Sequence, residues 1–150
     1  MTFRTEHGIV QLYMREVPVE LVVDTSALLA VLLDEPERAA LITLTQGATL
    51  LAPGSVPWEV GNGLVAGFRR KRLSARQVRD AWTSFERIPL RLLEVTVPKA
   101  LGLAEQLGLY AYDAYIIEAA RALGVPLLAL DGRLRTAAAK LGLEVWEVTS

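Results

Sequence analysis

The chain contains no cysteine and only one histidine, His7, among its 150 residues. The absence of cysteine excludes disulfide bonds, thiolate catalysis and zinc sites built from cysteine. A single histidine argues against a His-rich metal site and against a Ser-His-Asp hydrolase. Any chemistry must therefore come from carboxylates, hydroxyls and the basic side chains of lysine and arginine.

Long hydrophobic runs are missing too, although 52% of the residues are hydrophobic. Every apolar run is interrupted well before the roughly 18 residues that indicate a membrane span. The N-terminus shows no basic segment followed by an apolar stretch and a small-residue cleavage site, so nothing in it predicts export. We therefore expect a soluble, cytoplasmic protein with no membrane partner.

An excess of one charge is also lacking, because the formal net charge is −1. The basic residues are nevertheless clustered in one acid-free segment. We call this group the elbow cluster; it comprises Arg69, Arg70, Lys71, Arg72, Arg76 and Arg79. Two interpretations are open: a surface that attracts a polyanion such as RNA, or a solvated helix end and loop.

Short β-like runs alternate with longer helical patterns along the chain. This alternation predicts an α/β fold with a central parallel sheet of about five strands flanked by helices. The predicted strands are Leu21–Val23, Thr49–Ala52, Leu92–Thr96, Pro126–Leu130 and Glu144–Val148. No repeat or linker interrupts the pattern, and 150 residues suffice for one domain.

Apolar residues at helical spacing place helices between these strands. A helix or helix pair surrounds Asp34 to Pro36, with Pro36 suited to the first helical position. One helix follows Pro57 and another begins at Ser74, so the elbow cluster spans the turn between two helices. The remaining predicted helices are Ala100–Leu107 before Gly108, Asp113–Leu123 before Gly124, and a segment from Leu134 to Leu141 before Gly142.

Four acidic residues occupy notable positions in this pattern. Asp24 and Asp131 each follow a buried strand, at the sheet edge where parallel α/β proteins bind ligands. Glu59 lies one turn into a helix, where it shares a face with Asn62, and Asp113 heads a later helix. If the four carboxylates converge, their repulsion requires a cation, and hard divalent ions prefer oxygen ligands.

Each acid also has a structural explanation. Asp24 and Asp113 suit helix N-caps, Asp131 with the following glycine suits a turn, and Glu59 suits the positive end of its helix dipole. We expect Thr25 or Ser26 to cap the helix after the first strand, which would leave the Asp24 carboxylate free to bind an ion.

The acids lie in four segments that together resemble the PIN-domain ribonucleases, and most closely the VapC-like toxins of toxin–antitoxin modules. The segments are VVDTSALLA, PWEVGNGL, AYDAYIIEAA and LLALDGRL, in the order and approximate spacing of that family. The resemblance covers Leu21 to about Val148. It implies a three-layer fold whose first and fourth strands are adjacent at the centre of the sheet.

The resemblance also assigns roles to residues. Asp24, Glu59, Asp113 and Asp131 would form a catalytic metal site for Mg²⁺ or Mn²⁺, supported by Ser26; Asn62 is a further candidate. Many relatives have Thr or Ser two residues before the last acid, whereas this chain has Ala129. Residues 21–150 would form the nuclease domain. Residues 1–20 would be an N-terminal extension, either an edge strand, a partner-binding arm or a disordered segment.

The leading functional hypothesis is a metal-dependent endoribonuclease, the toxin of a type II toxin–antitoxin module, acting as a homodimer with a cognate antitoxin. The elbow cluster would bind RNA phosphates. Tyr110 and Tyr112 would either stack on a base or lie in the core. The alternative is a catalytically impaired PIN-like module that binds RNA or protein.

Three other classes fit less well. Ser26 stands where a phosphatase has its second acid, and a receiver domain needs an acid beside Asp24. A Gly-rich nucleotide site needs its glycines between strand and helix, whereas Gly61 and Gly63 lie inside a predicted helix.

Overall fold

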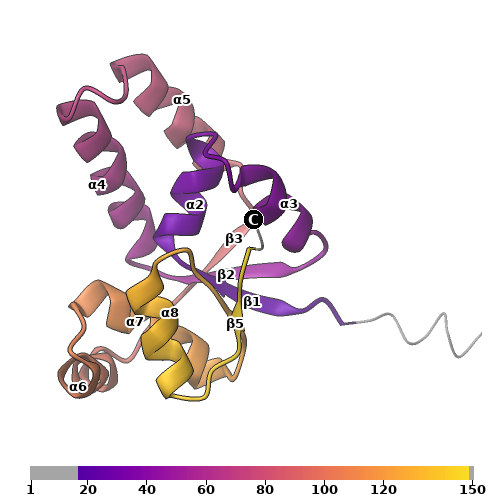
Figure 1. The fold of residues 1–150 in the computed structure, drawn as a ribbon, viewed down its shortest axis with the longest axis vertical. Coiled ribbons are helices and arrows are strands. Elements are labelled where there is room, and N and C mark those ends of the chain that lie inside the picture. Colours follow the sequence, from indigo (N-terminus) through magenta and orange to yellow (C-terminus); the bar gives the residue numbers. More distant parts are fainter. Residues whose placement is uncertain (1–16, 149–150) are drawn as a thin grey trace, which may run out of the picture.

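The computed structural model describes residues 17–148, which form a five-stranded parallel sheet between two helical layers (Figure 1). The strand order is β3-β2-β1-β4-β5. The strands are β1 (Glu20–Val23), β2 (Thr49–Pro53), β3 (Leu90–Leu93), β4 (Leu127–Leu128) and β5 (Val145–Trp146). The first and fourth strands are adjacent, as predicted, with Val22 beside Leu127 and Val23 beside Leu128.

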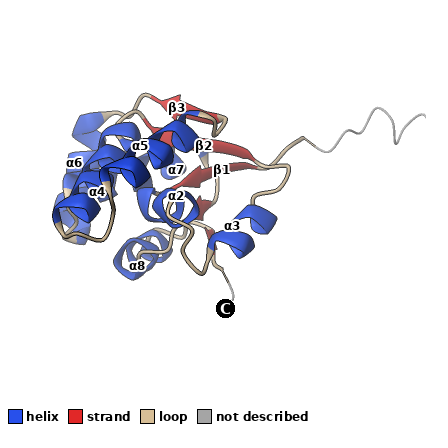
Figure 2. Cartoon of the chain, turned by 90° about the horizontal axis from the view of Figure 1, so that it is seen from above, coloured by secondary structure: helices blue, strands red, loops and turns tan. Residues whose placement is uncertain are grey.

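Seven helices flank the sheet in the described part of the chain. In Figure 1, the first four lie on one side of the sheet and the last three on the other, and Figure 2 shows the same elements from above. The helices are α2 (Thr25–Leu32), α3 (Arg38–Leu44), α4 (Val56–Arg69), α5 (Ala75–Glu86), α6 (Val97–Leu107), α7 (Ala111–Leu123) and α8 (Gly132–Lys140). The predicted three-layer α/β fold is confirmed.

The core lies where the central strands meet the helices. Leu21 and Val22 on β1 are fully buried, as are Leu51 on β2 and Leu127 on β4. These strands are almost continuously apolar because helices cover both of their faces. Glu118 on α7 is also buried, and Arg121 holds its carboxylate in a two-pronged ion pair at 2.8 and 2.9 Å.

Several predicted boundaries are wrong. Strand β3 ends at Leu93, because Thr96 occupies the N-cap position of helix α6 and the chain must leave the sheet before it. Strands β4 and β5 retain only two residues each. Pro36 is not the first helical residue: α3 begins at Arg38, after a turn in which Asp34 adopts a left-handed φ of 55°.

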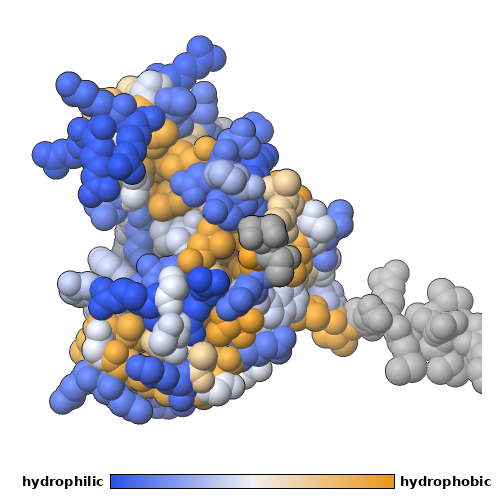
Figure 3. All heavy atoms as spheres, viewed as in Figure 1, coloured by the Kyte–Doolittle hydropathy of each residue, from blue (hydrophilic) through white to orange (hydrophobic). Residues whose placement is uncertain are grey.

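The predicted turn between α4 and α5 is present and carries the elbow cluster. Ser74 and Gln77 form a reciprocal capping box that starts α5. Gly67 permits the close approach of Leu73, whose Cδ1 atom would lie 2.7 Å from a Cβ at that position. The surface over this turn is strongly hydrophilic (Figure 3).

Two further predictions concern the N-terminal segment and membrane-spanning helices. The N-terminal extension over residues 1–20 falls almost wholly outside the described residues, so it stays a prediction. None of the helices within residues 17–148 is long and apolar enough to cross a membrane.

Candidate active site

Asp24 lies at the carboxyl end of β1 and is only 3% exposed. Its Oδ1 atom accepts a 2.9 Å hydrogen bond from the Ala27 amide, so Asp24 itself is the N-cap of α2. The expectation that Thr25 or Ser26 provides this cap is wrong, because both residues are already helical. Asp24 is therefore a cap and a buried carboxylate at once, since its second oxygen accepts from the Ser26 hydroxyl.

Ser26 links the two central strands at the site. Besides donating to Asp24, its hydroxyl oxygen accepts a 3.3 Å hydrogen bond from the Leu130 amide. The Asp24 amide in turn donates to the Leu128 carbonyl at 3.0 Å. The turn after β4 is thus fixed by Ser26, while Ala129, the residue that departs from the family pattern, is 1% exposed and packs in the core.

Asp131 follows this turn and caps α8. Its Oδ1 atom accepts a 2.9 Å hydrogen bond from the Leu134 amide. The alternative that Asp131 with Gly132 forms only a turn is therefore wrong, because Gly132 is the first residue of a helix. Unlike Asp24, Asp131 is solvent-exposed.

Glu59 lies in the first turn of α4 and is partly buried. The pKa of Glu59 is raised from 4.5 to about 7, mainly by burial and less by the charges of Asp113 and Asp24, while the hydroxyls of Ser55 and Thr25 act in the opposite direction. The Ser55 hydroxyl donates to Glu59 Oε2 at 3.3 Å. Glu59 is consequently held in place at the edge of the sheet and readily accepts a proton near neutral pH.

Asp113 lies in the first turn of α7 but does not cap it, because the N-cap is Tyr110. Partial burial raises the pKa of Asp113, and the charge of Asp131 raises it further, whereas the guanidinium of Arg133 lowers it. The side chain makes no hydrogen bond to a described residue that would explain it as a structural acid. Its carboxylate is therefore free for another partner.

Mutual repulsion shows which of the predicted residues lie together. The pKa of Asp24 is raised to about 6, mainly by burial; the hydrogen bonds from Ser26 and Ala27 lower it, and the charges of Asp131 and Asp113 add smaller increases. The charges of Asp113 and Asp131 act on Asp24, and those of Asp113 and Asp24 act on Glu59, so the four carboxylates share one region of the structure. Four helices and strands from distant parts of the chain bring these carboxylates to one edge of the sheet.

Other predicted residues lie apart from this group. Asn62 is solvent-exposed on α4, and no hydrogen bond connects it with a described acid. Arg69, at the start of the elbow cluster, is ten residues beyond Glu59 on the same helix, or about 15 Å along the axis. The elbow cluster is a separate surface rather than a wall of the carboxylate site.

Arg133 is a candidate that the sequence did not reveal. It lies in the first turn of α8, close enough to Asp113 to lower the pKa of that carboxyl. With Lys140 and Thr136 it also lines a hollow of about 330 Å³. An isolated arginine carries no sequence signal, and only its position two residues after Asp131 would have suggested a role.

The donor set has the chemistry that a hard divalent cation requires, because it consists of oxygen atoms. Thr25 Oγ1 is buried and lies close enough to the Glu59 carboxylate to lower its pKa, but it does not reach hydrogen-bond geometry with any residue within 17–148, which leaves it available to a bound water. The acids are nevertheless not closed into a ligand shell: among the described residues, no three His, Asp or Glu side chains are arranged to hold a metal ion. The predicted metal site stays a prediction.

A parallel sheet with acids at its carboxyl edge defines this chain as an α/β protein with a candidate catalytic site at the usual position. The chain matches the PIN domain family over residues 21–140, and it belongs to that family. No curated protein is similar enough in sequence to match.

Solved structures share the fold. PAE2754 from Pyrobaculum aerophilum is 25% identical, with a TM-score of 0.61 over 86% of this chain and 92% of that one. VapC20 from Mycobacterium tuberculosis, a sarcin-ricin loop cleaving toxin, is 20% identical, with a TM-score of 0.60 over 78% and 94%. FitAcB from Neisseria gonorrhoeae is 14% identical, with a TM-score of 0.60 over 85% and 96%.

Proposed function

We propose that this PIN domain protein is a divalent-metal-dependent endoribonuclease and the toxin component of a type II toxin–antitoxin module. The observation that carries the proposal is the group of four coupled carboxylates, two of them with pKa values raised to about 6 and 7. The membership in the PIN domain family and the fold shared with the toxin VapC20 support this proposal.

Asp24, Glu59, Asp113 and Asp131 would hold Mg²⁺ or Mn²⁺. When bound, the ion would lower the pKa of a water molecule and place its own positive charge beside the phosphodiester. The chain's own residues prepare this site. Ser26 and Ser55 orient the carboxylates of Asp24 and Glu59. Instead of binding the ion directly, Glu59 would alternatively exchange a proton with water or with the leaving oxygen, because its pKa is raised to about 7 in the metal-free protein.

RNA binding would use two positive surfaces. Arg133 lies beside Asp113 and would contact the phosphate near the cut. The elbow cluster, at the far end of α4, would bind phosphates further along the strand and add affinity without sequence choice. We also propose, from the family resemblance, a homodimer, a cognate antitoxin that blocks the site, residues 21–150 as the nuclease domain and a cytoplasmic location.

A second candidate function is a PIN module that binds RNA or protein without cutting it. The observation in its favour is that no three of the described acids are arranged to hold a metal ion. The two proposals differ in a single measurable property, which is RNA cleavage dependent on a divalent ion.

The test is cleavage of a mixed RNA pool with mapped ends, in Mg²⁺, in Mn²⁺ and in EDTA. We expect ion-dependent cuts that Asp113→Asn reduces by about a hundredfold or more. Glu105→Gln is the matched control, because Glu105 is an exposed acid on α6 and should leave the rate unchanged. Intact RNA in every lane, with folded protein that still binds RNA, would instead establish the non-cleaving module.

A further inference from the structure

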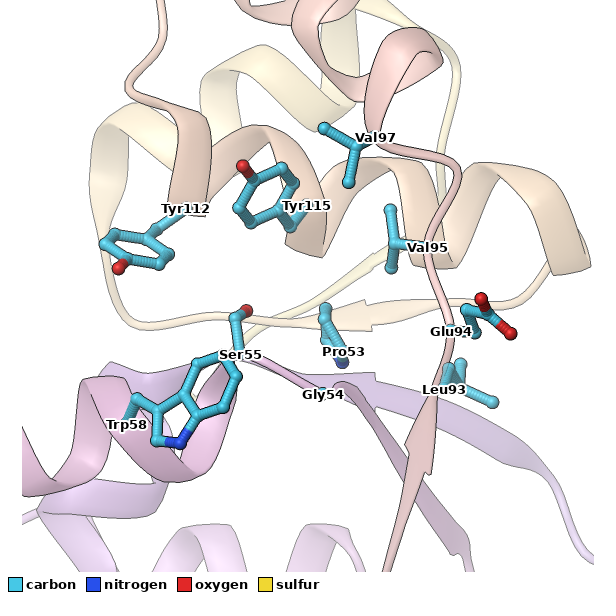
Figure 4. Close-up of a pocket in the computed structure, with 10 residues that line it drawn as sticks. All are labelled: Pro53, Gly54, Ser55, Trp58, Leu93, Glu94, Val95, Val97, Tyr112 and Tyr115. Atoms are coloured by element: carbon cyan, nitrogen blue, oxygen red, sulfur yellow. The ribbon is translucent and has the colours of Figure 1, made fainter.

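A pocket of about 400 Å³ opens beside the candidate active site (Figure 4). Its aromatic end is formed by Trp58 on α4 and by Tyr112 and Tyr115 on α7, with Ser55 between them. The far end is aliphatic apart from Glu94, which lies opposite the aromatic residues (Figure 4). The volume falls within the range of about 300–1,000 Å³ that is usual for small-molecule sites.

The pocket adjoins the carboxylate group through two of its lining residues, although none of the four acids lines it. Ser55, which lies between the aromatic side chains, donates its hydroxyl to Glu59 at 3.3 Å. Tyr112 immediately precedes Asp113 on the first turn of α7. The base of a nucleotide could therefore occupy the pocket while the phosphate of the same nucleotide lies at the acids.

The aromatic side chains are unusually exposed for their size. Trp58 is 75% exposed and Tyr112 is 51% exposed, so neither is explained by the core. This excludes the alternative that Tyr112 lies in the core. Tyr112 lies edge-on to Tyr115, with ring centroids 5.9 Å apart and planes 81° apart. These two exposed rings provide flat surfaces of the kind on which bases stack.

We propose that this pocket receives one unpaired nucleobase of the RNA strand, stacked against Trp58 and Tyr112, next to the phosphodiester that is cut. The assignment rests on the proposed function, because it takes RNA as the substrate. Stacking requires a splayed, single-stranded base, since a paired base in an A-form helix hides both faces between its neighbours. The pocket therefore selects single-stranded segments or loops over duplex RNA.

The test measures the contribution of the bases separately from that of the phosphates. Two fluorescein-labelled strands of about 12 nucleotides are compared by anisotropy in Mg²⁺: oligoadenylate and a strand of the same length that is abasic throughout. Asp113→Asn protein is used so that neither strand is cut. The dissociation constant of the abasic strand divided by that of oligoadenylate reports base contacts, because both strands carry the same phosphates.

We expect oligoadenylate to bind more tightly than the abasic strand, and we expect Trp58→Ala to reduce this ratio by about 5- to 150-fold, the effect of losing one stacked base. Trp58→Phe should retain most of the ratio because it keeps an aromatic face. Phe68→Ala is the matched control: Phe68 is 48% exposed on the same helix but ten residues from Trp58, so its loss should leave the ratio unchanged.

Two results would overturn the assignment. One is an equal ratio in Trp58→Ala and the parent protein, with both folded by circular dichroism. The other is a similar loss of affinity for both strands together with a halved mass in solution, which would make the aromatic end a protein–protein contact. Failure of the proposed function is distinguishable: wild-type protein that cuts no RNA but keeps a Trp58-dependent ratio would refute the nuclease and leave the base site intact.

Discussion

Replacement of Asp24 by asparagine separates the structural role of this residue from its charge. Asparagine is as good an N-cap as aspartate, so its side-chain oxygen can still accept from the Ala27 amide. The hydroxyl of Ser26 can rotate to accept from the new amide group. The substitution therefore removes a buried negative charge while the end of α2 stays capped.

The size of the effect follows from the pKa of Asp24. Burial raises this pKa from 3.8 to about 6, which corresponds to about 3 kcal/mol of destabilisation when the carboxyl is ionised. Asp24 binds a proton more tightly in the folded protein than in the unfolded chain. The stability that this tighter proton binding provides is fully present below about pH 4 and is lost as the pH rises through 6. Asp24→Asn abolishes that loss.

The assay is urea and thermal unfolding in EDTA, followed by circular dichroism between about pH 4 and pH 7.5. The free energy of unfolding of Asp24→Asn minus that of wild type should rise by about 3 kcal/mol from the acid end to the neutral end. This corresponds to about 6–12 °C in Tm for a chain of this size. Asp131→Asn is the matched control, because Asp131 also caps a helix but is exposed, and it should change little.

Mg²⁺ provides the complementary arm of this experiment. A cation bound to the carboxylates would stabilise wild type and lose much of that effect in Asp24→Asn. The reasoning is refuted if the difference between Asp24→Asn and wild type in EDTA is the same at both ends of the pH range, because the buried charge would then have no cost.

Three further predictions concern the ion pair on α7, the glycines of α4 and the elbow cluster. Arg121→Ala should lower the free energy of unfolding, because it leaves the Glu118 carboxylate buried without its partner. Gly61→Ala should stabilise by about 0.5–1 kcal/mol, because a Cβ there meets no atom within 4 Å. Gly63→Ala should be about 1–2 kcal/mol less stable than Gly61→Ala, because its Cβ would lie 2.6 Å from Leu29 Cδ1. Replacing three arginines of the elbow cluster by glutamine should weaken RNA binding and lower the slope of log K against log salt concentration by about 2–3.

Each of these has an internal check. Glu118→Gln combined with Arg121→Ala should recover much of the lost stability, since the amide carries no charge; no recovery would mean that the pair acts through packing alone. Equal stability of the two glycine variants would refute the close contact between α4 and α2. An unchanged salt slope would show that the elbow cluster contacts no phosphates, and it would then be a solvated turn.

Much of the fold could be predicted from local pattern. The alternation of apolar strands with amphipathic helices is a property of neighbouring residues, so it specified the parallel sheet and the helix pair around the elbow cluster. Helix ends marked by Gly108 and Gly124 were also predictable, because both adopt a left-handed φ, of 64° and 63°, which glycine alone adopts without cost. Short strands and their limits were not, because β4 is defined by its neighbours in the sheet rather than by its own residues.

The sequence by itself determined which residues could carry chemistry: with no cysteine and one histidine, only oxygen ligands were available, and four acids stood in the order of the PIN family. Only the tertiary structure decided how those acids are used. It made Asp24 both cap and buried carboxylate, brought Arg133 beside Asp113, kept the elbow cluster away, and opened the pocket between Trp58 and Tyr112. The physical reason is that desolvation and charge coupling depend on distances between elements far apart in the chain, and no local pattern encodes those distances.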